Sequence, residues 1–288
     1  MKELNDRLAS LLTEAGAAAF GSAPAAPVEK EEWERFESWL EKGFNAGMEY
    51  MKNYPEIRRD PRLLLEGAQT VISVAFNYRQ PNPYPGIATY AIGQDYHKVL
   101  RKRLKRAVNE IREEFGGNWR ICIDSAPVLE RYWARKCGIG SRSPIHGNII
   151  IPGTGSMVFL AEIISSLEVV LSGTAVTDTG KPFPPETRQP RCPTGALQPG
   201  GCIDARKCIN YLTIEKKEPL TEEERELAGQ AFFGCDICQL GCAENRGPTP
   251  QILPEFRPLP GLKEFIDGTN PDFPISISPL ARKFKHTR

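Results

Sequence analysis

The chain has 288 residues, eight cysteines and a formal net charge of +1, from 37 basic and 36 acidic side chains. The charge balance excludes a uniformly basic protein that coats nucleic acid, and a hydrophobic content of 40% excludes wholesale disorder. No apolar run approaches the ~18 residues that a membrane span needs. The N-terminal segment is too acidic and amphipathic for a signal peptide, so we expect a cytoplasmic protein without membrane contact.

Three segments have the apolar spacing of amphipathic helices, namely residues 3–15, 30–42 and the second half of 88–115. The stretch 16–27 is rich in Ala, Gly and Pro and predicts an irregular connection between the first two. A further helix is predicted directly after Ser125, because a polar residue followed by proline in the first turn favours a helix start.

Runs of β-branched and apolar residues predict strands at 70–77 and 119–124 and a short strand at 148–152. Residues 156–165 fit either a strand or a helix. Near residue 172 the chain becomes rich in Gly, Pro and Thr, which indicates a domain boundary. We therefore predict an α+β fold whose N-terminal α/β domain covers residues 1–172.

Six of the eight cysteines fall after residue 172. Thiols stay reduced in the cytoplasm, so cysteines at short spacing indicate metal or redox chemistry rather than disulfides. Bacterial-type ferredoxins hold clusters with the motif C-x2-C-x2-C-x3-C-P, whose fourth cysteine ligates the other cluster of the pair. Cys192-Pro193 matches the end of such a run, but the three preceding ligand positions hold Pro182, Pro185 and Arg188.

Exchange of the fourth ligand assigns Cys192, Cys208, Cys235 and Cys238 to one 4Fe-4S cluster, because four thiolates are required. The partner cluster would keep only Cys242. The sequence therefore predicts a single cluster. It would lie in a ferredoxin-like segment over residues 173–250, followed by a C-terminal tail over 251–288 that packs on the core.

Other interpretations of these cysteines stay open. Four thiolates also suit a structural zinc site, and the pair at 235–238 has the spacing of a redox C-x-x-C motif, although no thioredoxin-like βαβ pattern surrounds it. Cys122 and Cys137 lie in apolar settings and fit uncoordinated core thiols. Cys202 and Cys242 are interpreted as spare thiols.

Several motifs follow one another along the chain. They are ATYAIGQDYHKVLRKRL (88–104), IDSAPVLERYWARKCGIG (123–140), CPTGAL (192–197), DARKCINYLTIE (204–215) and FGCDICQLGC (233–242). In this order, and over about residues 15–285, the sequence resembles the cobalamin-dependent, iron–sulfur epoxyqueuosine reductases of tRNA queuosine synthesis.

The resemblance implies a base-off cobalamin in the N-terminal domain and reduction of epoxyqueuosine in tRNA to queuosine, with an external electron donor. The family's catalytic acid maps onto Asp124, which would protonate the leaving epoxide oxygen. A helix N-cap is the alternative role for Asp124. Tyr96, His97 and Ser125 map to the cobalamin pocket, and for His97 the alternative is a cap or packing at a helix start.

The segment after His97 carries a dense basic stripe, which the resemblance assigns to tRNA phosphates. Its members are Lys98, Arg101, Lys102, Arg103, Lys105 and Arg106. A solvated helix face is the alternative, because Glu110, Glu113 and Glu114 soon counter the charge.

Two departures from the family pattern bear on function. Cysteines are missing at 182, 185 and 188, which breaks a two-cluster relay. After Gly140 the family has W-I-G-K, whereas this chain has Ser-Arg-Ser-Pro at 141–144. Two functions follow, an active reductase running on one cluster, or a degenerate, catalytically inactive member that acts as a single-cluster electron carrier or binding protein. The sequence gives no indication of the oligomeric state.

Overall fold

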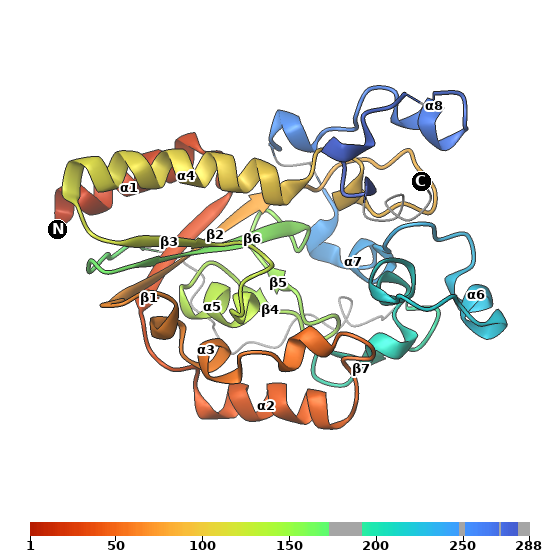
Figure 1. Ribbon diagram of the computed structural model, residues 1–288, viewed down its shortest axis with the longest axis horizontal. Helices are drawn as coiled ribbons and strands as arrows, with labels where there is room; N and C mark the ends of the chain where they lie inside the picture. Colours follow the sequence, from red (N-terminus) through yellow and green to blue (C-terminus); the bar gives the residue numbers. More distant parts are fainter. Residues whose placement is uncertain (173–191, 248–250, 271, 282–288) are drawn as a thin grey trace.

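A four-stranded sheet lies at the centre of the N-terminal part of the computed structural model, which describes residues 1–172, 192–247, 251–270 and 272–281 (Figure 1). The strand order is β1-β2-β6-β3, and each neighbouring pair is antiparallel. The strands are β1 (Ala19–Pro24), β2 (Thr70–Asn77), β3 (Trp119–Cys122) and β6 (Val158–Ser165).

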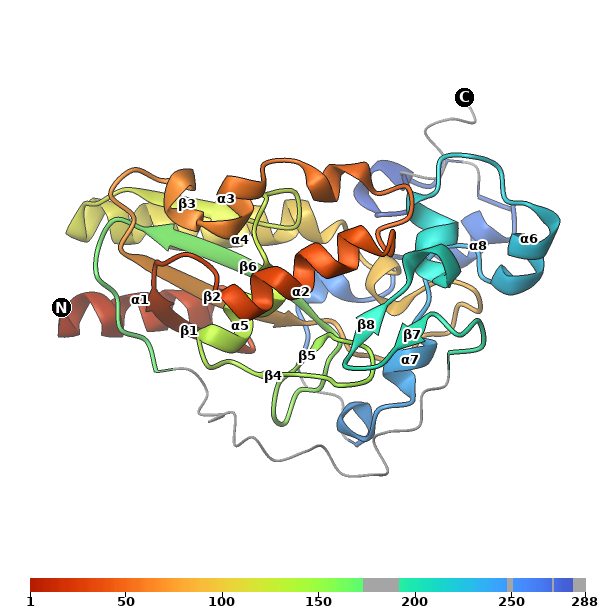
Figure 2. The same cartoon turned by 90° about the horizontal axis from the view of Figure 1, so that it is seen from below.

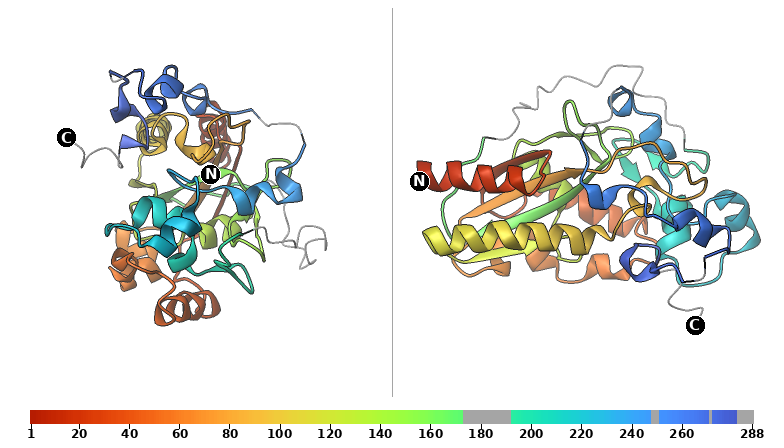
Figure 3. Two further views of the ribbon diagram at one scale, coloured as in Figure 1. Left: turned by 90° about the vertical axis from the view of Figure 1, so that its right-hand side faces the viewer. Right: turned by 90° about the horizontal axis from the view of Figure 1, so that it is seen from above.

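Two helices, α1 (Lys2–Glu14) and α4 (Tyr96–Phe115), lie side by side over one face of this sheet (Figures 1 and 3). Their leucines pack on alternate residues of β2, because side chains two apart on a strand share a face. The fully buried members of this core include Leu8, Leu12, Leu100, Leu104, Ile72, Val74 and Phe76. Each such side chain contributes roughly 1.5–3 kcal/mol to folding.

The helix α5 (Glu130–Lys136) covers the opposite face, where Trp133 packs with Val71 of β2 and Ile164 of β6. In Figure 1, α2 (Lys30–Glu41) and α3 (Pro55–Arg59) lie below α5, so α2 is in front of α5 in Figure 2, which is seen from below. The loop between β3 and α5 exposes Asp124 and Ser125.

The remaining elements are short. Two-stranded ribbons pair β4 (Ser141–Arg142) with β5 (Ile149–Ile150), and β7 (Leu197–Gln198) with β8 (Cys202–Ile203). Three short helices follow: α6 (Glu222–Ala228), α7 (Ile237–Leu240) and α8 (Leu262–Ile266). Single helical turns occur at Glu49–Lys52, Pro61–Leu64, Thr89–Ala91, Ala205–Lys207, Tyr211–Glu215, Ala243–Asn245, Pro254–Phe256 and Ile275–Ile277.

The C-terminal tail holds the segment that precedes α4. The Gln94 amide donates to the Glu255 carbonyl at 2.8 Å, and the Asp95 amide donates to the Ile277 carbonyl at 2.7 Å. A Cβ atom on Gly93 would lie 2.6 Å from the Cα of Phe256, so glycine permits this close approach. The tail thereby fixes the first turn of α4.

The predicted α+β fold class is confirmed, and residues 70–77 form the predicted strand. Residues 156–165 form a strand rather than a helix, since β6 pairs with both β2 and β3. The stretch 16–27 was wrongly predicted to be irregular, because it contains the edge strand β1. No helix within the described ranges is both long and apolar enough to cross a membrane. The predicted boundary near residue 172 borders residues 173–191, which lie outside the described part.

Candidate active site

Asp124 lies on the loop between β3 and α5 in a left-handed conformation, with φ +53°. Its Oδ2 lies 2.9 Å from Nε2 of His97, and its backbone N–H donates to Oε1 of Glu130 at 2.8 Å. The predicted N-cap role is wrong, because α5 begins at Glu130, the N-cap is Leu129, and no side chain caps the helix. The turn brings the carboxyl group to His97 at the edge of the domain.

His97 lies between two carboxylates in the first turn of α4. Its Nδ1 lies 2.8 Å from Oδ1 of Asp95, the residue that caps α4 by accepting the His97 amide. Burial alone would lower the pKa of His97, but the hydrogen bonds and charges of Asp124 and Asp95 outweigh it and raise the pKa to about 9. At neutral pH His97 is therefore an imidazolium that donates to both carboxylates.

Tyr96 supports the His97 ring by stacking. The ring centroids of Tyr96 and His97 are 4.0 Å apart, and Tyr96 also stacks on Phe159 of β6 at 4.3 Å with an interplanar angle of 8°. Two of the residues predicted for the cofactor pocket, Tyr96 and His97, are thus in direct contact beside Asp124.

Two further carboxyl groups, those of Glu130 and Glu162, belong to the surroundings of Asp124. Burial, together with the negative charge of Asp124, raises the pKa of Glu130 to about 7. Glu162 is fully buried on β6, and burial and the neighbouring Glu130 raise its pKa well above the usual value despite a hydrogen bond from Ser73 at 3.3 Å. The protonated form of Glu162 is therefore favoured, and Glu130 is partly protonated at pH 7.

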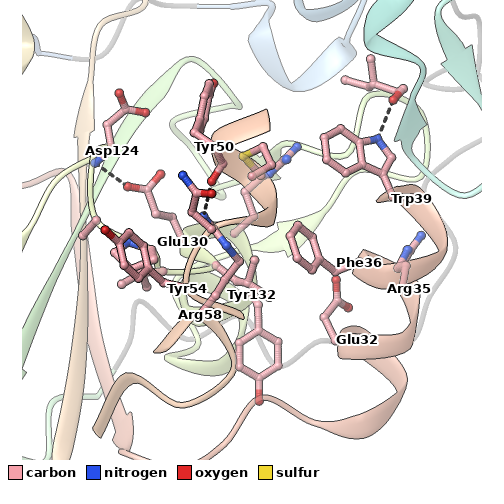
Figure 4. Close-up of a pocket in the computed structure, with 18 of the residues that line it drawn as sticks. Glu32, Arg35, Phe36, Trp39, Tyr50, Tyr54, Arg58, Asp124, Glu130 and Tyr132 are labelled. Atoms are coloured by element: carbon pink, nitrogen blue, oxygen red, sulfur yellow. Dashed lines mark hydrogen bonds between the residues drawn. The ribbon is translucent and has the colours of Figure 1, made fainter. Parts of the chain in front are cut away.

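A cavity of about 610 Å³ opens beside this loop (Figure 4). Asp124 and Ser125 contribute to its wall, whereas Tyr96 and His97 do not line it. The Ser125 hydroxyl donates to the Ile123 carbonyl at 3.2 Å. Aromatic residues form much of the remaining wall: Phe36, Trp39, Tyr50, Tyr54 and Tyr132. The cavity therefore joins apolar walls to the Asp124 carboxyl group.

Guanidinium groups also line the cavity. Arg58 is 7% exposed, lies over the Phe36 ring at 5.6 Å and donates to the Tyr50 carbonyl at 3.4 Å. Burial lowers the pKa of Arg58, and Tyr50 and Glu130 oppose that effect. Arg35, Arg131, Arg135 and Arg142 complete the basic part of the wall.

The four cysteines predicted to bind a cluster lie within electrostatic range of one another. Burial and the charges of Cys235, Cys208 and Cys192 raise the pKa of Cys238 to about 12. The pKa of Cys235 is likewise raised by burial and by Cys208 and Cys192. The four cysteines therefore lie near one another and are the donor type that a 4Fe-4S cluster requires. However, no group of three or more His, Cys, Asp or Glu side chains within the described ranges is gathered closely enough to hold a metal ion.

The other four cysteines have different surroundings. Cys122 and Cys137 are buried beneath α5, and burial raises the pKa of each to about 12, as expected for core thiols. Cys202 lines the cavity. Cys242 is buried with its Sγ 3.0 Å from Nε2 of His146, itself fully buried. Burial and Arg131 lower the pKa of His146 to about 4, so the imidazole is neutral at pH 7.

The predicted basic stripe on α4 is divided between the protein and the surface. Arg103 forms an ion pair with Glu255 at 2.8 Å, Lys98 donates to the Ser276 carbonyl at 3.0 Å, and Arg106 pairs with Glu110 at 3.1 Å. Arg101, Lys102 and Lys105 are exposed. Half of the stripe therefore stabilises the tail or the helix itself.

Comparisons with known proteins match both parts of the chain. Residues 58–125 match the family model described as epoxyqueuosine reductase QueG, DUF1730, and residues 189–245 match a 4Fe-4S double cluster binding domain. The epoxyqueuosine reductase of Leadbetterella byssophila is 37% identical over 262 residues, which cover 86% of this chain and 82% of the relative. That of Escherichia coli K12 is 37% identical and covers 78% and 61%.

A solved structure has the same fold. The crystal structure of an epoxyqueuosine reductase with an epoxyqueuosine-modified tRNA-Tyr stem loop superposes with a TM-score of 0.76, at 26% identity, over 90% of this chain and 70% of that chain. The fold and the matched segments define an iron–sulfur protein with an α+β domain preceding its cluster segment. Within that class, the chain belongs to the epoxyqueuosine reductase family.

The family match is to a double-cluster domain, whereas the sequence has proline or arginine at 182, 185 and 188. Those positions lie outside the described residues. Cys242 is the one cysteine that the sequence leaves for a second cluster, and it contacts His146, two residues beyond the 141–144 segment that departs from the family motif.

Several site residues were missed in the sequence. Glu162 carried a signal, because a lone carboxylate within the apolar run VFLAEIIS indicates a buried acid. Glu130 lies in the motif at 123–140, but the sequence suggested no role for it. Arg58, Arg142 and His146 had no local signal, because their partners come from distant segments.

Proposed function

We propose that this chain reduces epoxyqueuosine in tRNA to queuosine, with cobalamin in the cavity beside Asp124 and one 4Fe-4S cluster. The observation that carries the proposal is the Asp124 carboxyl group, half exposed at the cavity and hydrogen-bonded to a protonated His97. Family membership supplies the substrate class, since a relative of the same fold was solved with an epoxyqueuosine-modified tRNA stem loop.

The cavity suits a flat corrin. Aromatic walls offer apolar contact to its faces, and the guanidinium groups offer donors to the amide oxygens at its rim. Ser125 and Asp124 would face it from the β3–α5 loop, and Tyr96 and His97 would hold Asp124 from behind. The proposed ligands of the cluster are Cys192, Cys208, Cys235 and Cys238.

Removal of the epoxide oxygen as water consumes two electrons and two protons. Bound cobalamin and the cluster supply the electron chemistry, fed by an external donor. Asp124 would protonate the oxygen as the C–O bond breaks, which lowers the barrier because an alkoxide is a poor leaving group. Because the Nε2–H of His97 donates to the Asp124 carboxylate at 2.9 Å, this proton would pass from His97 through Asp124 to the oxygen. The second proton would come from solvent.

The proposed domains assign one task to each part of the chain. Residues 1–172 would bind cobalamin, residues 173–250 would hold the cluster, and residues 251–288 would pack on the core. Arg101, Lys102 and Lys105 on the exposed side of α4 would meet tRNA phosphates. Their charge would strengthen tRNA binding without reading the base sequence.

Expression of the full chain in a strain that lacks its own reductase tests the function. We expect queuosine to replace epoxyqueuosine in total tRNA nucleosides measured by liquid chromatography and mass spectrometry. If purified protein binds cobalamin and iron but restores no queuosine, the chain is instead a degenerate family member that serves as a single-cluster carrier or binding protein.

Iron stoichiometry tests the single cluster. After anaerobic reconstitution we expect about four irons and four sulfides per chain, because four ligands complete one cluster. Cys238→Ser should lose most of the iron, whereas the matched variant Cys202→Ser, at a thiol in the cavity wall, should keep it. About eight irons per chain, or zinc without iron, would contradict the assignment.

A further inference from the structure

Three arginines from separate elements meet at one side of the cavity. Arg35 comes from α2, Arg131 from α5 and Arg142 from β4, and Figure 4 shows Arg35 and Glu32 on neighbouring turns of α2. A backbone carbonyl holds each guanidinium: Arg35 donates to Gly200, Arg131 to Gly147 at 3.5 Å, and Arg142 to Gly201 at 3.2 Å. Each guanidinium is thereby directed by one backbone acceptor, while Arg35 and Arg131 stay exposed at the cavity and Arg142 is half-buried.

The arginines outnumber the carboxylates beside them. Glu32 forms an ion pair with Arg142 at 2.9 Å and also lies 4.0 Å from Arg135. In the described part of the chain, Arg35 and Arg131 form no ion pair. Burial, followed by the positive charges of Arg35 and Arg131, lowers the pKa of Arg142 to about 10. Glu130 also faces Arg131, so three guanidinium groups meet two carboxyl groups, Glu32 and the partly protonated Glu130, and the cluster keeps a net positive charge.

One donor of this cluster is also unsatisfied. The Nε atom of Arg142 is buried and has no hydrogen-bond partner among the residues that the structure describes. A buried donor without a partner is costly, and native structures rarely leave one. The Nε atom is covered by protein, so an anion in the cavity would meet the terminal N–H groups of the three guanidiniums, and their net positive charge is what favours it.

We propose that Arg35, Arg131 and Arg142 form a subsite that binds a phosphate group. The guanidinium group of arginine binds both carboxylate and phosphate. A carboxylate has two acceptor oxygens, too few for three guanidinium groups, so a phosphate group suits this cluster better. Arg142 belongs to the 141–144 segment where this chain departs from the family motif. The proposal rests on the proposed function for the source of the phosphate, either the nucleotide loop of cobalamin or the backbone of tRNA.

Binding of inorganic phosphate tests the subsite without either ligand. Full-length protein is titrated with phosphate at constant ionic strength, with chloride as the balancing ion, and binding is read by calorimetry. We expect Arg35→Gln and Arg142→Gln each to raise the dissociation constant for phosphate at least about tenfold. The control Arg106→Gln removes a mostly exposed arginine on α4 and should bind like wild type. Equal affinities in all four proteins, or no binding to wild type, would overturn the proposal.

Two further probes identify the source. Cobinamide has the corrin ring but lacks the nucleotide phosphate, so a cofactor source predicts that wild type prefers cobalamin and that Arg35→Gln loses the preference. If the phosphate belongs to RNA, Arg35→Gln should bind corrinoids like wild type. It should bind a tRNA stem loop more weakly than wild type does, with a shallower salt dependence. If wild type binds phosphate but neither corrinoid, the subsite stands and the proposed cofactor fails.

Discussion

Replacing Asp124 with asparagine is expected to lower the rate of epoxide reduction by a factor of about 10² to 10⁴, the usual contribution of a positioned acid. Asparagine has the same shape and tolerates the left-handed backbone at φ +53°, so the loop should keep its conformation. Its amide cannot deliver a proton to the epoxide oxygen. The variant therefore removes the proton while retaining a polar contact with His97.

Single-turnover conversion of epoxyqueuosine tRNA by the chemically reduced holoenzyme measures this step. Iron content and cobalamin binding are recorded for the same sample, and both should match wild type. Asp267→Asn, at an exposed carboxylate that ends α8, serves as the matched control and should react at the wild-type rate. A rate for Asp124→Asn within about threefold of wild type would remove Asp124 from the acid role.

The elements that were predictable are those with a clear local pattern. Helix α4 repeats its apolar residues along one face, and β2, which is buried on both faces, is rich in β-branched and apolar residues, so the type of each follows from local sequence. The prediction missed strand β1 because its Ala, Gly and Pro content is typical of a loop. Its pairing partner β2 lies about 50 residues further along the chain. Tertiary pairing outweighed local propensity there.

The start of α5 was predicted too early, for a reason tied to function. Ser125 and Pro127 form a favourable local start, yet the helix begins at Glu130. The intervening residues form a turn whose first residue, Asp124, bonds both His97 and Glu130. Placing the Asp124 carboxyl group beside His97 requires a turn, and that turn takes up the residues that would otherwise have formed the first turn of α5.

The site divides in the same way. The cysteine pattern can be compared with a ferredoxin motif in the sequence alone, and the assignment of the four cluster ligands stays a prediction. The arginine subsite could not be predicted in this way, because Arg35 and Arg142 are more than 100 residues apart and meet only through α2 and the β4–β5 ribbon. The contact of Cys242 with His146 also joins distant segments, so spacing could only suggest a spare thiol.

The pH dependence of stability tests the His97 pair. The pKa of His97 rises from 6.5 to about 9 on folding, and its side chain is 18% exposed, so the shift corresponds to about 3 kcal/mol. Because the folded pKa is the higher one, this stabilisation is complete below pH 6.5 and is lost as the pH rises through 9. Wild type and His97→Gln should therefore differ most near pH 6 and converge above pH 9.

Urea unfolding at pH 6, 7.5 and 9.5 measures the effect as a free energy of unfolding. His146→Gln is the control, because the pKa of His146 is lowered to about 4 and its titration contributes no slope above pH 6.5. Its difference from wild type should stay constant from pH 7.5 to 9.5, whereas that of His97→Gln should shrink. A constant difference for both variants would mean that His97 is not held protonated between Asp95 and Asp124, and the proton supply to Asp124 would then need another source.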